Sequence, residues 1–425
     1  MRRSRRSPLL VGLIVAAAAA AWVILCLGPK KGQPSKPSLV VLSRLWSVPH
    51  EKAFVLNEII APFEVEHGCR VDFQTLDDDA LLKRARVQQA SGRVSTDVVI
   101  AYVSRMREWV EQDHVIDLSA TVDGWKDRTF AEGFSDLTVF DGGRFFLPIC
   151  ADDYLLCANI KALQYLPEGA DPATLTWAQL ADWALAVREG EGEGKFAFTC
   201  VAQQMLIYQI GCAVLSYGGR FPEIGSPEAM KVWELFVRMK EAFAPTVRTY
   251  DSVVPPMKRG EAWLTVSHNA RVGEIYASNP TQFLIGPPPL GPAGRGSIVG
   301  FSGLGICAGC PSRDLAVSFL EYLTRPEVQL ELARGTGGFV PTVSEATALL
   351  GESREDEVIR HAIGVLEDGI LAYIPPHRDW GAVKLVVDEA FHKVVFDEGR
   401  IDEAYLRSAQ GRLDRLLAEA DKPSP

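Results

Sequence analysis

The alternation of short apolar runs with segments of helical periodicity, which continues along the chain beyond its N-terminal segment, constrains the fold more than any other feature. SLVVLSRLW (38–46) and TDVVIAY (96–102) are apolar runs of strand length, whereas segment 49–68 between them places Leu56 and Phe63 on one helical face. Parallel strands need crossover connections, which helices normally provide. The pattern therefore predicts an α/β fold with a largely parallel sheet.

Several helices are predicted from the residues that begin them. Thr176 and Gln179 match a capping box, Ser226 precedes a proline at the start of the next helix, and Thr324 with Glu327 matches a second capping box. The apolar faces of these helices need burial. We therefore expect core positions for the tryptophans that they carry, Trp177, Trp183 and Trp233.

The chain has 425 residues, 47% of them apolar, and can bury one large core or two medium ones. Two lobes are predicted. The net charge of −10 becomes more negative when the basic N-terminal residues are set aside. An acidic body argues against a nucleic-acid partner.

Segment 1–38 is predicted to be a membrane anchor or signal segment that ends in a polar tether. Four arginines precede Leu9–Leu27, an uncharged run of 19 residues that would span the hydrocarbon core of a bilayer as a helix. The basic flank should stay in the cytoplasm while the rest is exported. We expect an uncleaved anchor; a cleaved signal peptide and lipidation at Cys26 are the alternatives.

The eight cysteines cannot be paired from the sequence alone, so their disulfide state stays open. Cys307 and Cys310 form a CxxC motif without a second such pair or a nearby histidine, and a zinc site is not predicted. GLGICA (303–308) matches a dinucleotide fingerprint in its letters, but the segment continues as an extended chain and opens no helix. No metal or cofactor is predicted.

Motifs of catalysis are absent from the sequence: it has no Walker loop, no HExxH and no GxSxG. Asp152 and Asp153 follow a predicted strand, but adjacent residues of an extended chain point to opposite faces and cannot flank one glycosidic bond. A carboxylate that accepts hydrogen bonds from sugar hydroxyls is the preferred interpretation.

Aromatic residues stand at the ends of predicted strands, namely Trp46, Tyr102 and Phe301. Ligands of open α/β sheets bind at the carboxyl ends of strands, and aromatic faces pack against the C–H faces of sugar rings. The hydroxyl residues near these aromatic residues are Ser47, Ser104 and Ser302. Together these positions predict a sugar-binding cleft.

The order of several motifs resembles the extracellular solute-binding proteins of ABC importers, the family that includes maltodextrin-binding protein. Its typical helix, strand, proline-rich loop and closing L-T-x-P-E helix correspond to MKRGEAWLTVSHNA (257–270), IGPPPLGPAGRG (285–296) and LTRPEVQLELA (323–333). GGRFFLPICADDYLLCANI (142–160) and LTWAQLADWA (175–184) match further motifs. The resemblance covers nearly all of the chain from residue 39 to residue 415.

The resemblance implies an α/β, two-lobed periplasmic-binding-protein-like fold (type II), in which crossing strands join the lobes at a hinge. It implies residues 39–151 and 281–335 for lobe 1, and residues 152–280 and 336–425 for lobe 2. In this scheme GPPPLGPAG (286–294) is a loop near the cleft, reached after the chain has crossed back to the first lobe.

The family also implies a set of ligand-binding residues. Ala270 stands where maltodextrin binders have a tryptophan, which puts maltodextrin itself in doubt. Phe301 and Ser302 are included from their position at a strand end. The predicted ligand-binding residues are Trp46, His50, Glu51, Tyr102, Ser104, Arg105, Asp152, Asp153, Tyr208, Asn269, Phe301, Ser302 and Trp380.

The function implied by the resemblance is that of a monomeric, non-enzymatic solute-binding protein outside the cytoplasm, which delivers a mono- or oligosaccharide to an ABC permease. One alternative is an anchored glycoside hydrolase, which needs two carboxyls facing one another across a cleft. Another is a binding domain that reports to a membrane sensor. Within the binding class, a polyamine or a phosphorylated polyol stays open as the ligand.

Overall fold

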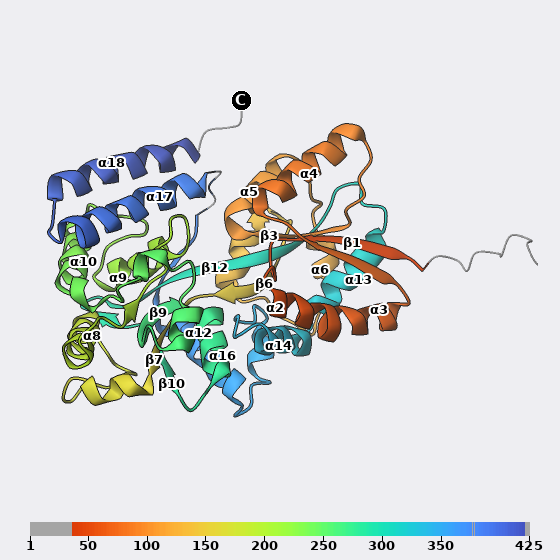
Figure 1. Cartoon of the computed structure of the whole chain (residues 1–425). Coiled ribbons are helices and arrows are strands. Elements are labelled where there is room, and N and C mark those ends of the chain that lie inside the picture. The colour runs from red at the N-terminus through yellow and green to blue at the C-terminus, as the bar shows by residue number, and fades with distance from the viewer. Residues whose placement is uncertain (1–35, 376, 378, 421–425) are drawn as a thin grey trace, which may run out of the picture.

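The computed structural model describes residues 36–375, 377 and 379–420. Residues 1–35 of the predicted anchor segment 1–38, including Cys26, lie outside the described residues. Two α/β bodies stand side by side, each built around its own sheet (Figure 1). Among the described residues, no helix combines the length and apolar character needed to cross a membrane.

A seven-stranded sheet forms the core of the first body and extends along β12 to the second body, where β11 and β13 pair with the start of β12. Its path runs β11-β12-β3-β1-β2, and β6 and β13 also pair with β12. The predicted parallel part is β2-β1-β3, whereas β12 runs antiparallel to both β3 and β6. The strands are β1 (Ser38–Ser43), β2 (Arg70–Thr75), β3 (Val98–Tyr102), β6 (Leu147–Asp152), β11 (Leu290–Gly291), β12 (Gly294–Ile306) and β13 (Ile370–Tyr373).

Helices connect and cover these strands as the periodicity predicts. The first crossover helix ends at Gly68, whose φ of 60° suits a glycine cap. The elements that accompany the first sheet are α2 (Pro49–Phe54), the π-helix η1 (Val55–Ile60), α3 (Ala61–His67), α4 (Asp78–Ser91), α5 (Val103–Glu111), α6 (Ser119–Val122), α7 (Glu132–Ser135), η2 (Asp136–Thr138), the hairpin β4 (Val139–Phe140) and β5 (Gly143–Arg144), α13 (Arg313–Leu323), α14 (Pro326–Gly335) and α15 (Ser344–Thr347).

The second body is built on a four-stranded sheet in the order β10-β7-β9-β8. Its strands are β7 (Tyr154–Asn159), β8 (Phe196–Ala197), β9 (Leu264–His268) and β10 (Phe283–Gly286). Its helices are η3 (Ile160–Tyr165), α8 (Trp177–Glu191), α9 (Leu206–Ser216), α10 (Pro227–Arg238), η4 (Lys240–Ala242), η5 (Val247–Thr249), α11 (Val254–Arg259), α12 (Asn269–Ser278), α16 (Arg354–Asp368), α17 (Trp380–Phe391), the π-helix η6 (His392–Glu398) and α18 (Glu403–Ala420).

Crossing segments join the two bodies. The chain leaves β6 through Asp153 directly into β7, and it returns along the 13-residue strand β12, which runs between the bodies in Figure 1. The first residues of β12 pair with β13, and its last residues pair with β3 and β6. The register of β12 against β6 shifts between Gly300 and Ser302.

The proline-rich loop lies on the second body, and its predicted position after the crossing is wrong. β10 falls within segment 281–335, which the sequence assigned to lobe 1, but it pairs with β7 in the second sheet. The backbone N–H groups of Leu290 and Ala293 donate to the carbonyls of Leu175 and Ser216, at 2.8 and 2.9 Å. The loop therefore precedes the crossing, which β12 makes.

The tryptophans of the predicted helices lie in the core of the second body. Trp177, Trp183 and Trp233 are all 1% exposed or less, and each indole N–H donates a hydrogen bond. The capping box of α8 and the Ser226 cap of α10 are confirmed. The box predicted at Thr324 is wrong, because the Thr324 hydroxyl donates to the Leu320 carbonyl and ends α13 instead of opening α14.

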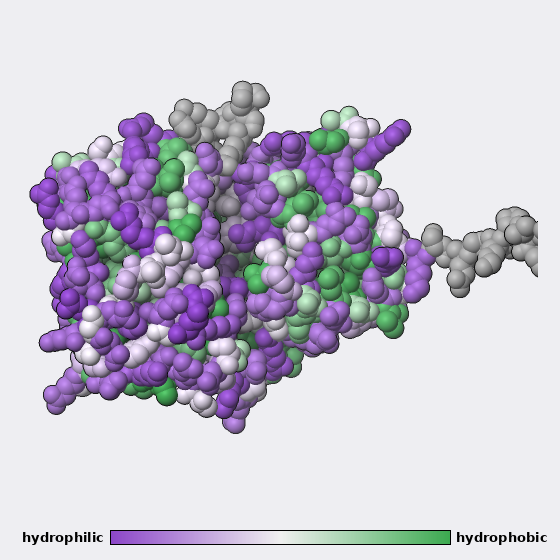
Figure 2. Space-filling model, in the orientation of Figure 1, coloured by the Kyte–Doolittle hydropathy of each residue, from purple (hydrophilic) through white to green (hydrophobic). Residues whose placement is uncertain are grey.

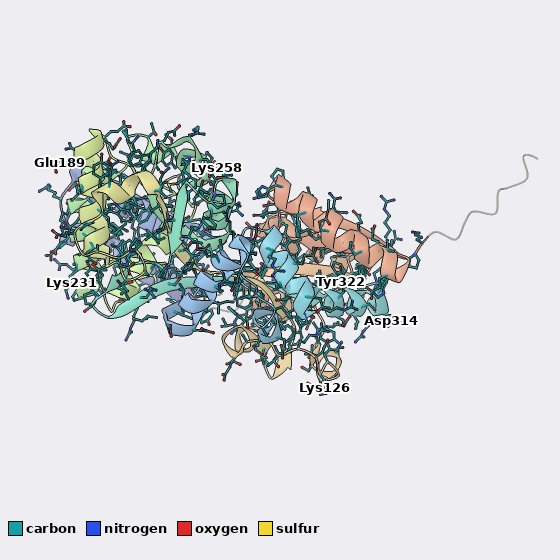
Figure 3. All side chains as sticks on the ribbon, turned by 90° about the horizontal axis from the view of Figure 1, so that it is seen from below. Lys126, Glu189, Lys231, Lys258, Asp314 and Tyr322 are labelled. Atoms are coloured by element: carbon teal, nitrogen blue, oxygen red, sulfur yellow. The ribbon has the colours of Figure 1, made fainter. Side chains whose placement is uncertain are left out.

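The charged side chains of the outer helices extend into solvent. Glu189 and Lys231 project from the second body, whereas Lys126 and Asp314 project from the first (Figure 3). The face shown in Figure 2 is largely hydrophilic, and it is hollowed along the junction of the two bodies.

Candidate ligand-binding site

A cavity of about 670 Å3 lies between the two bodies. Its size falls in the range of small-molecule sites. One wall comes from the first body, the other from the second, and Phe339 lies on a segment between them. The lining residues are Arg44, Leu45, Trp46, Ser47, Val48, Glu51, Thr75, Leu76, Asp77, Asp78, Thr199, Gln204, Met205, Asp251, Ser252, Ser267, His268, Arg271 and Phe339.

The wall of the first body is formed where β1 and β2 end. Trp46 follows β1 with a φ of 58°, and its ring packs 5.9 Å from that of Phe73. Asp77 follows β2 and accepts a hydrogen bond from the Ala80 N–H at 2.8 Å, which caps α4. The carboxyl ends of these parallel strands thus deliver an aromatic ring and carboxylates to one place.

An ion pair joins the two walls. Glu51 of α2, which is 3% exposed, bonds to Arg271 of α12. Arg271 also contacts Glu274 at 2.9 Å. A buried carboxylate is costly unless it is paired, so Arg271 compensates the burial of Glu51 while linking two elements from different bodies.

His268 is held in a defined tautomer at the base of the second wall. Its Nδ1 accepts from the Ala270 N–H at 3.2 Å, and its Nε2 lies 3.4 Å from an oxygen of Asp152. In the neutral ring the proton is therefore assigned to Nε2, on the side of the carboxylate. Asp152 lies directly behind this wall residue.

Tyr102 lies behind the first wall. The Arg44 guanidinium carbon lies 4.2 Å from the centre of the Tyr102 ring, and the Arg44 Nε lies 3.5 Å from a carboxylate oxygen of Asp78. Burial, with a further contribution from Asp152, raises the pKa of Tyr102 well above its ordinary value. A β-carbon on Gly300 would lie 2.0 Å from the Tyr102 hydroxyl, so only glycine leaves room for this ring.

The predicted ligand-binding residues differ in whether they line the cavity. Trp46 and Glu51 line it, and Tyr102 and Asp152 contact residues that do. His50 is exposed and does not line it.

Two further predicted residues, Ser104 and Arg105, lie on α5 outside the lining. The Ser104 carbonyl accepts from the His377 N–H at 3.0 Å. The Arg105 guanidinium bonds to Asp79 at 2.9 Å and to Glu108 at 3.2 Å. Neither residue is among those that line the cavity.

Four predicted residues belong to the core of the crossing region and do not line the cavity: Asp153, Asn269, Phe301 and Ser302 are each 0% exposed. The Asn269 amide donates to the Gly338 carbonyl at 2.9 Å, and Phe301 packs 5.4 Å from Phe134. The Asp153 carboxylate makes no hydrogen bond with the described residues, and burial, then Asp152, raises its pKa well above the ordinary value.

The aromatic residues predicted to stack on a ligand from the second lobe face each other instead. The Trp380 indole donates to the Tyr208 hydroxyl at 2.7 Å, and both rings pack near Phe221. Both residues are less than 10% exposed and neither lines the cavity. Their own hydrogen bond and shared packing account for their burial.

Sequence reasoning missed most of the polar lining. Thr75 and Asp78 could have been found, because they end or follow a strand as Trp46 does. Ser267 and His268 end the strand LTVSH, one or two positions before the predicted Asn269. Thr199, Gln204, Asp251 and Ser252 come from irregular segments, for which the sequence carries no equivalent signal.

Metal ligation finds no support in the described part of the chain, where no group of three or more histidine, cysteine, aspartate or glutamate residues could hold an ion. The seven described cysteines are all free thiols. The hydroxyl, amide and carboxylate groups of the cavity lining suit a polar organic molecule held through hydrogen bonds.

A family model of bacterial extracellular solute-binding proteins matches residues 58–360. The chain belongs to this family. The family places the protein outside the cytoplasm and gives it a small-molecule solute. No curated protein sequence matches the chain significantly.

Solved structures of solute-binding proteins share the two-lobed fold. The GacH receptor of Streptomyces glaucescens, solved unliganded and with acarbose, matches at a TM-score of 0.73 with 16% identity, over 91% of this chain and 100% of that one. Maltose-bound MalE3 of T. maritima matches at 0.72 with 20% identity, over 89% and 99%. UgpB of Mycobacterium tuberculosis, in complex with glycerophosphocholine, matches at 0.70 with 16% identity, over 91% and 99%.

Proposed function

We propose that the protein binds a mono- or oligosaccharide in the cavity between its lobes and delivers it unaltered to an ABC permease. The observation that carries this proposal is the cavity of about 670 Å3, in which hydroxyl, amide and carboxylate groups from both lobes surround a space bordered by Trp46, itself 2% exposed. Sugars are recognised by this combination of ring faces and hydrogen-bonding groups. The similar solute-binding proteins that hold acarbose or maltose support the choice of ligand class.

Binding is favoured over hydrolysis because three of the four cavity carboxylates are already engaged by other residues. Glu51 is paired with Arg271, Asp77 caps α4, and Asp78 lies 3.5 Å from Arg44. A glycosidase needs one carboxyl that can donate a proton and a second across the bond. Release of a chromophore from aryl glycosides by the purified protein would establish the hydrolase alternative.

The charged groups of the cavity lining favour a second class of ligand. The cavity lining holds four carboxylates, on Glu51, Asp77, Asp78 and Asp251, against the two guanidinium groups of Arg44 and Arg271. This surplus of acid would suit an amine-bearing ligand better than a phosphorylated polyol. A polyamine and a glycerophosphodiester therefore belong in the same screen as the sugars.

The test is a thermal-shift screen followed by calorimetry on the full chain. A bound solute should raise the melting temperature, because ligands that bind only the folded state stabilise it. Gln204→Trp places a large ring at an exposed position of the lining and should abolish the shift. Gln164→Trp, at an exposed position outside the lining, is the matched control and should retain it. No response to any sugar at millimolar concentration would reject the ligand class.

The remaining parts of the proposal are a monomeric state, an N-terminal anchor and a role in import. The lobe boundaries of the sequence analysis are proposed with β10 moved into the second lobe. Solute uptake by cells that lack the gene separates import from a sensing role, because only an importer is needed for accumulation of the labelled sugar.

A further inference from the structure

The CxxC motif is one feature that solute binding does not explain. It lies directly after β12, in a turn that leads to α13. The Cys310 N–H donates to the Cys307 carbonyl at 3.1 Å, and Gly309 has a φ of 76°. A glycine with positive φ at the third position is typical of a type II β-turn, with the two cysteines as its first and last residues.

Neighbouring segments hold this turn in place. The N–H groups of Cys307 and Ala308 donate to the carbonyls of Asp97 and His114, each at 2.9 Å. The Gln89 side chain donates to the Ala308 carbonyl at 2.9 Å. The first and last Cα atoms of a β-turn lie within about 7 Å, which is compatible with the spacing of about 4.4–6.8 Å that a disulfide needs.

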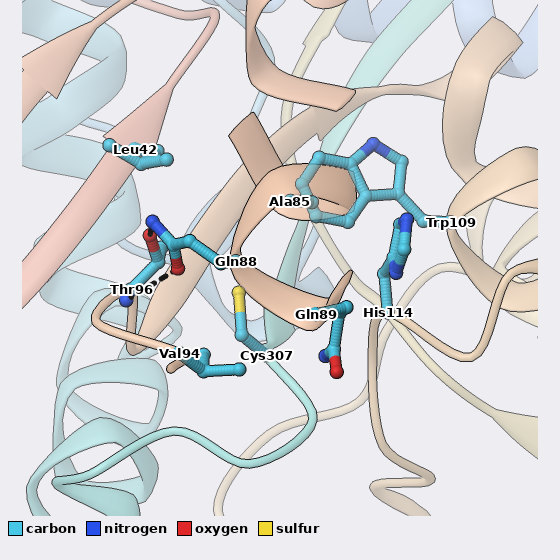
Figure 4. A pocket seen from close by; sticks show the side chains of 9 residues that line it. All are labelled: Leu42, Ala85, Gln88, Gln89, Val94, Thr96, Trp109, His114 and Cys307. Carbon is cyan, nitrogen blue, oxygen red and sulfur yellow. Dashed lines mark hydrogen bonds between the residues drawn. The ribbon is translucent and has the colours of Figure 1, made fainter. Parts of the chain in front are cut away.

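The two thiols differ in accessibility. Cys307 is 4% exposed and borders a gap of about 10 Å3, and its sulfur points toward Gln88 (Figure 4). Cys310 is half-buried and so is open to a reagent from solvent. Closure of a disulfide would require the Cys307 sulfur to turn away from the gap toward Cys310.

We propose that Cys307 and Cys310 are an oxidisable dithiol that closes into an intramolecular disulfide outside the cytoplasm. The family's extracellular location supplies the setting in which disulfides persist. The seven described cysteines include no other pair three residues apart in the sequence. This modification site is independent of the solute, since the turn shares no residue with the cavity lining.

The reaction needs an oxidant, which is a disulfide of another protein or of a small thiol. The Cys310 thiolate attacks that disulfide, forms a mixed disulfide and releases one thiol of the oxidant. The Cys307 thiolate then attacks the Cys310 sulfur and releases the second thiol. Two electrons and two protons thus pass to the oxidant, and one bond between the cysteines is formed.

Two physical consequences follow for the rate and the stability. Burial raises the pKa of both thiols, so the reacting thiolates are scarce at neutral pH and oxidation should accelerate as the pH rises. The bond closes a loop of only four residues, and short loops restrict the unfolded chain little. The melting temperature should therefore change by no more than a few degrees on oxidation.

The experiment uses the purified full-length protein, reduced and then incubated with glutathione disulfide at pH 8. Thiols that remain are labelled with a maleimide in denaturant and counted by intact mass. We expect two fewer labels than in the reduced protein, and a peptide map with Cys307 joined to Cys310. Cys310→Ser should prevent this loss, whereas Cys157→Ser, at a buried position of β7, should not.

Retention of every label, a cross-link between other cysteines, or glutathione held at Cys310 as the final product would each overturn the proposal. Cys307→Ser provides a second variant that should behave as Cys310→Ser does. Solute binding is measured on both redox forms and should be equal. Failure of the disulfide is thereby distinguished from failure of the proposed solute-binding function.

Discussion

The two walls of the cavity are built in different ways. The first-lobe wall comes from residues that end or follow the parallel strands β1 and β2, and it carries Trp46. The second-lobe wall comes mainly from irregular segments at Thr199–Met205 and Asp251–Ser252, together with the junction of β9 and α12. A sheet edge places its side chains by a rule that holds across α/β folds, whereas irregular segments depend on contacts with the rest of the protein.

The aromatic residues show the same difference. Trp46 reaches the first wall, but Tyr208 and Trp380 bond to each other behind the second wall. The predicted stacking from the second lobe would require these two rings to line the cavity, which they do not in this structure. Of these three rings only that of Trp46 lines the cavity, whereas polar groups line it from both walls.

The largest expected effect comes from breaking the ion pair between the walls. Arg271→Ala would leave Glu51, 3% exposed, without its cation and should destabilise the fold by about 4 kcal/mol. Urea denaturation of the variant measures this loss. The double variant with Glu51→Gln should recover a substantial part of it; no recovery would mean that Arg271 acts through packing alone.

Next in size is the close approach of α12 to the segment between the lobes. A β-carbon on Gly273 would lie 1.8 Å from the Gly337 carbonyl oxygen, so Gly273→Ala should cost about 3 kcal/mol. Gly364→Ala, in α16 with open space around it, is the control and should stabilise by about 1 kcal/mol. Equal melting temperatures for the two variants would contradict the observed packing.

The pH dependence of stability tests how Asp388 supports the second wall. Asp388 of α17 accepts from the Gln203 N–H at 2.5 Å, and burial raises its pKa to about 6. The folded protein therefore keeps a proton that the unfolded chain loses between about pH 4 and pH 6, so stability falls as the pH rises through this window.

Asp388→Asn removes that titration and should flatten the pH profile by about 2 kcal/mol. Guanidinium denaturation at pH 4.5 and pH 7.5 measures the difference for the native chain and the variant. An unchanged slope would show that other carboxyls account for the pH dependence.

The smallest effect is expected from the ring pair behind the second wall. Trp380→Phe removes the hydrogen bond to Tyr208 and should cost about 1 kcal/mol of stability. Solute affinity should stay within twofold, because neither ring lines the cavity. A much larger loss of affinity, measured by calorimetry, would show that Trp380 contributes to solute binding.

Much of the fold was predictable because it depends on local patterns. The buried run Val98–Tyr102, the glycine cap at Gly68 and the capping box of α8 each follow from a few adjacent residues. The predicted cap at Thr324 was wrong, because the same hydroxyl can bond backward to Leu320 and end a helix. The adjacent sequence does not show whether a threonine hydroxyl caps the start of one helix or bonds backward at the end of another.

The site was predictable only where strand ends define it. Trp46 was identified in this way, and Asp78 could have been, whereas Phe301 lies within a strand that continues five residues beyond it. Asn269 follows a strand as predicted, yet its amide is used to hold Gly338. Whether a polar side chain faces solvent or another backbone segment is decided by long-range contacts that the sequence pattern does not contain.

The strand β12 also determines when the first lobe can be completed during synthesis. Ser302 pairs with Tyr102, 200 positions earlier in the chain, and Leu304 pairs with Leu147. Contacts over such separations form slowly. The first 150 residues therefore emerge from the ribosome without the strand that completes their sheet, and the first lobe can be completed only after β12 has been synthesised.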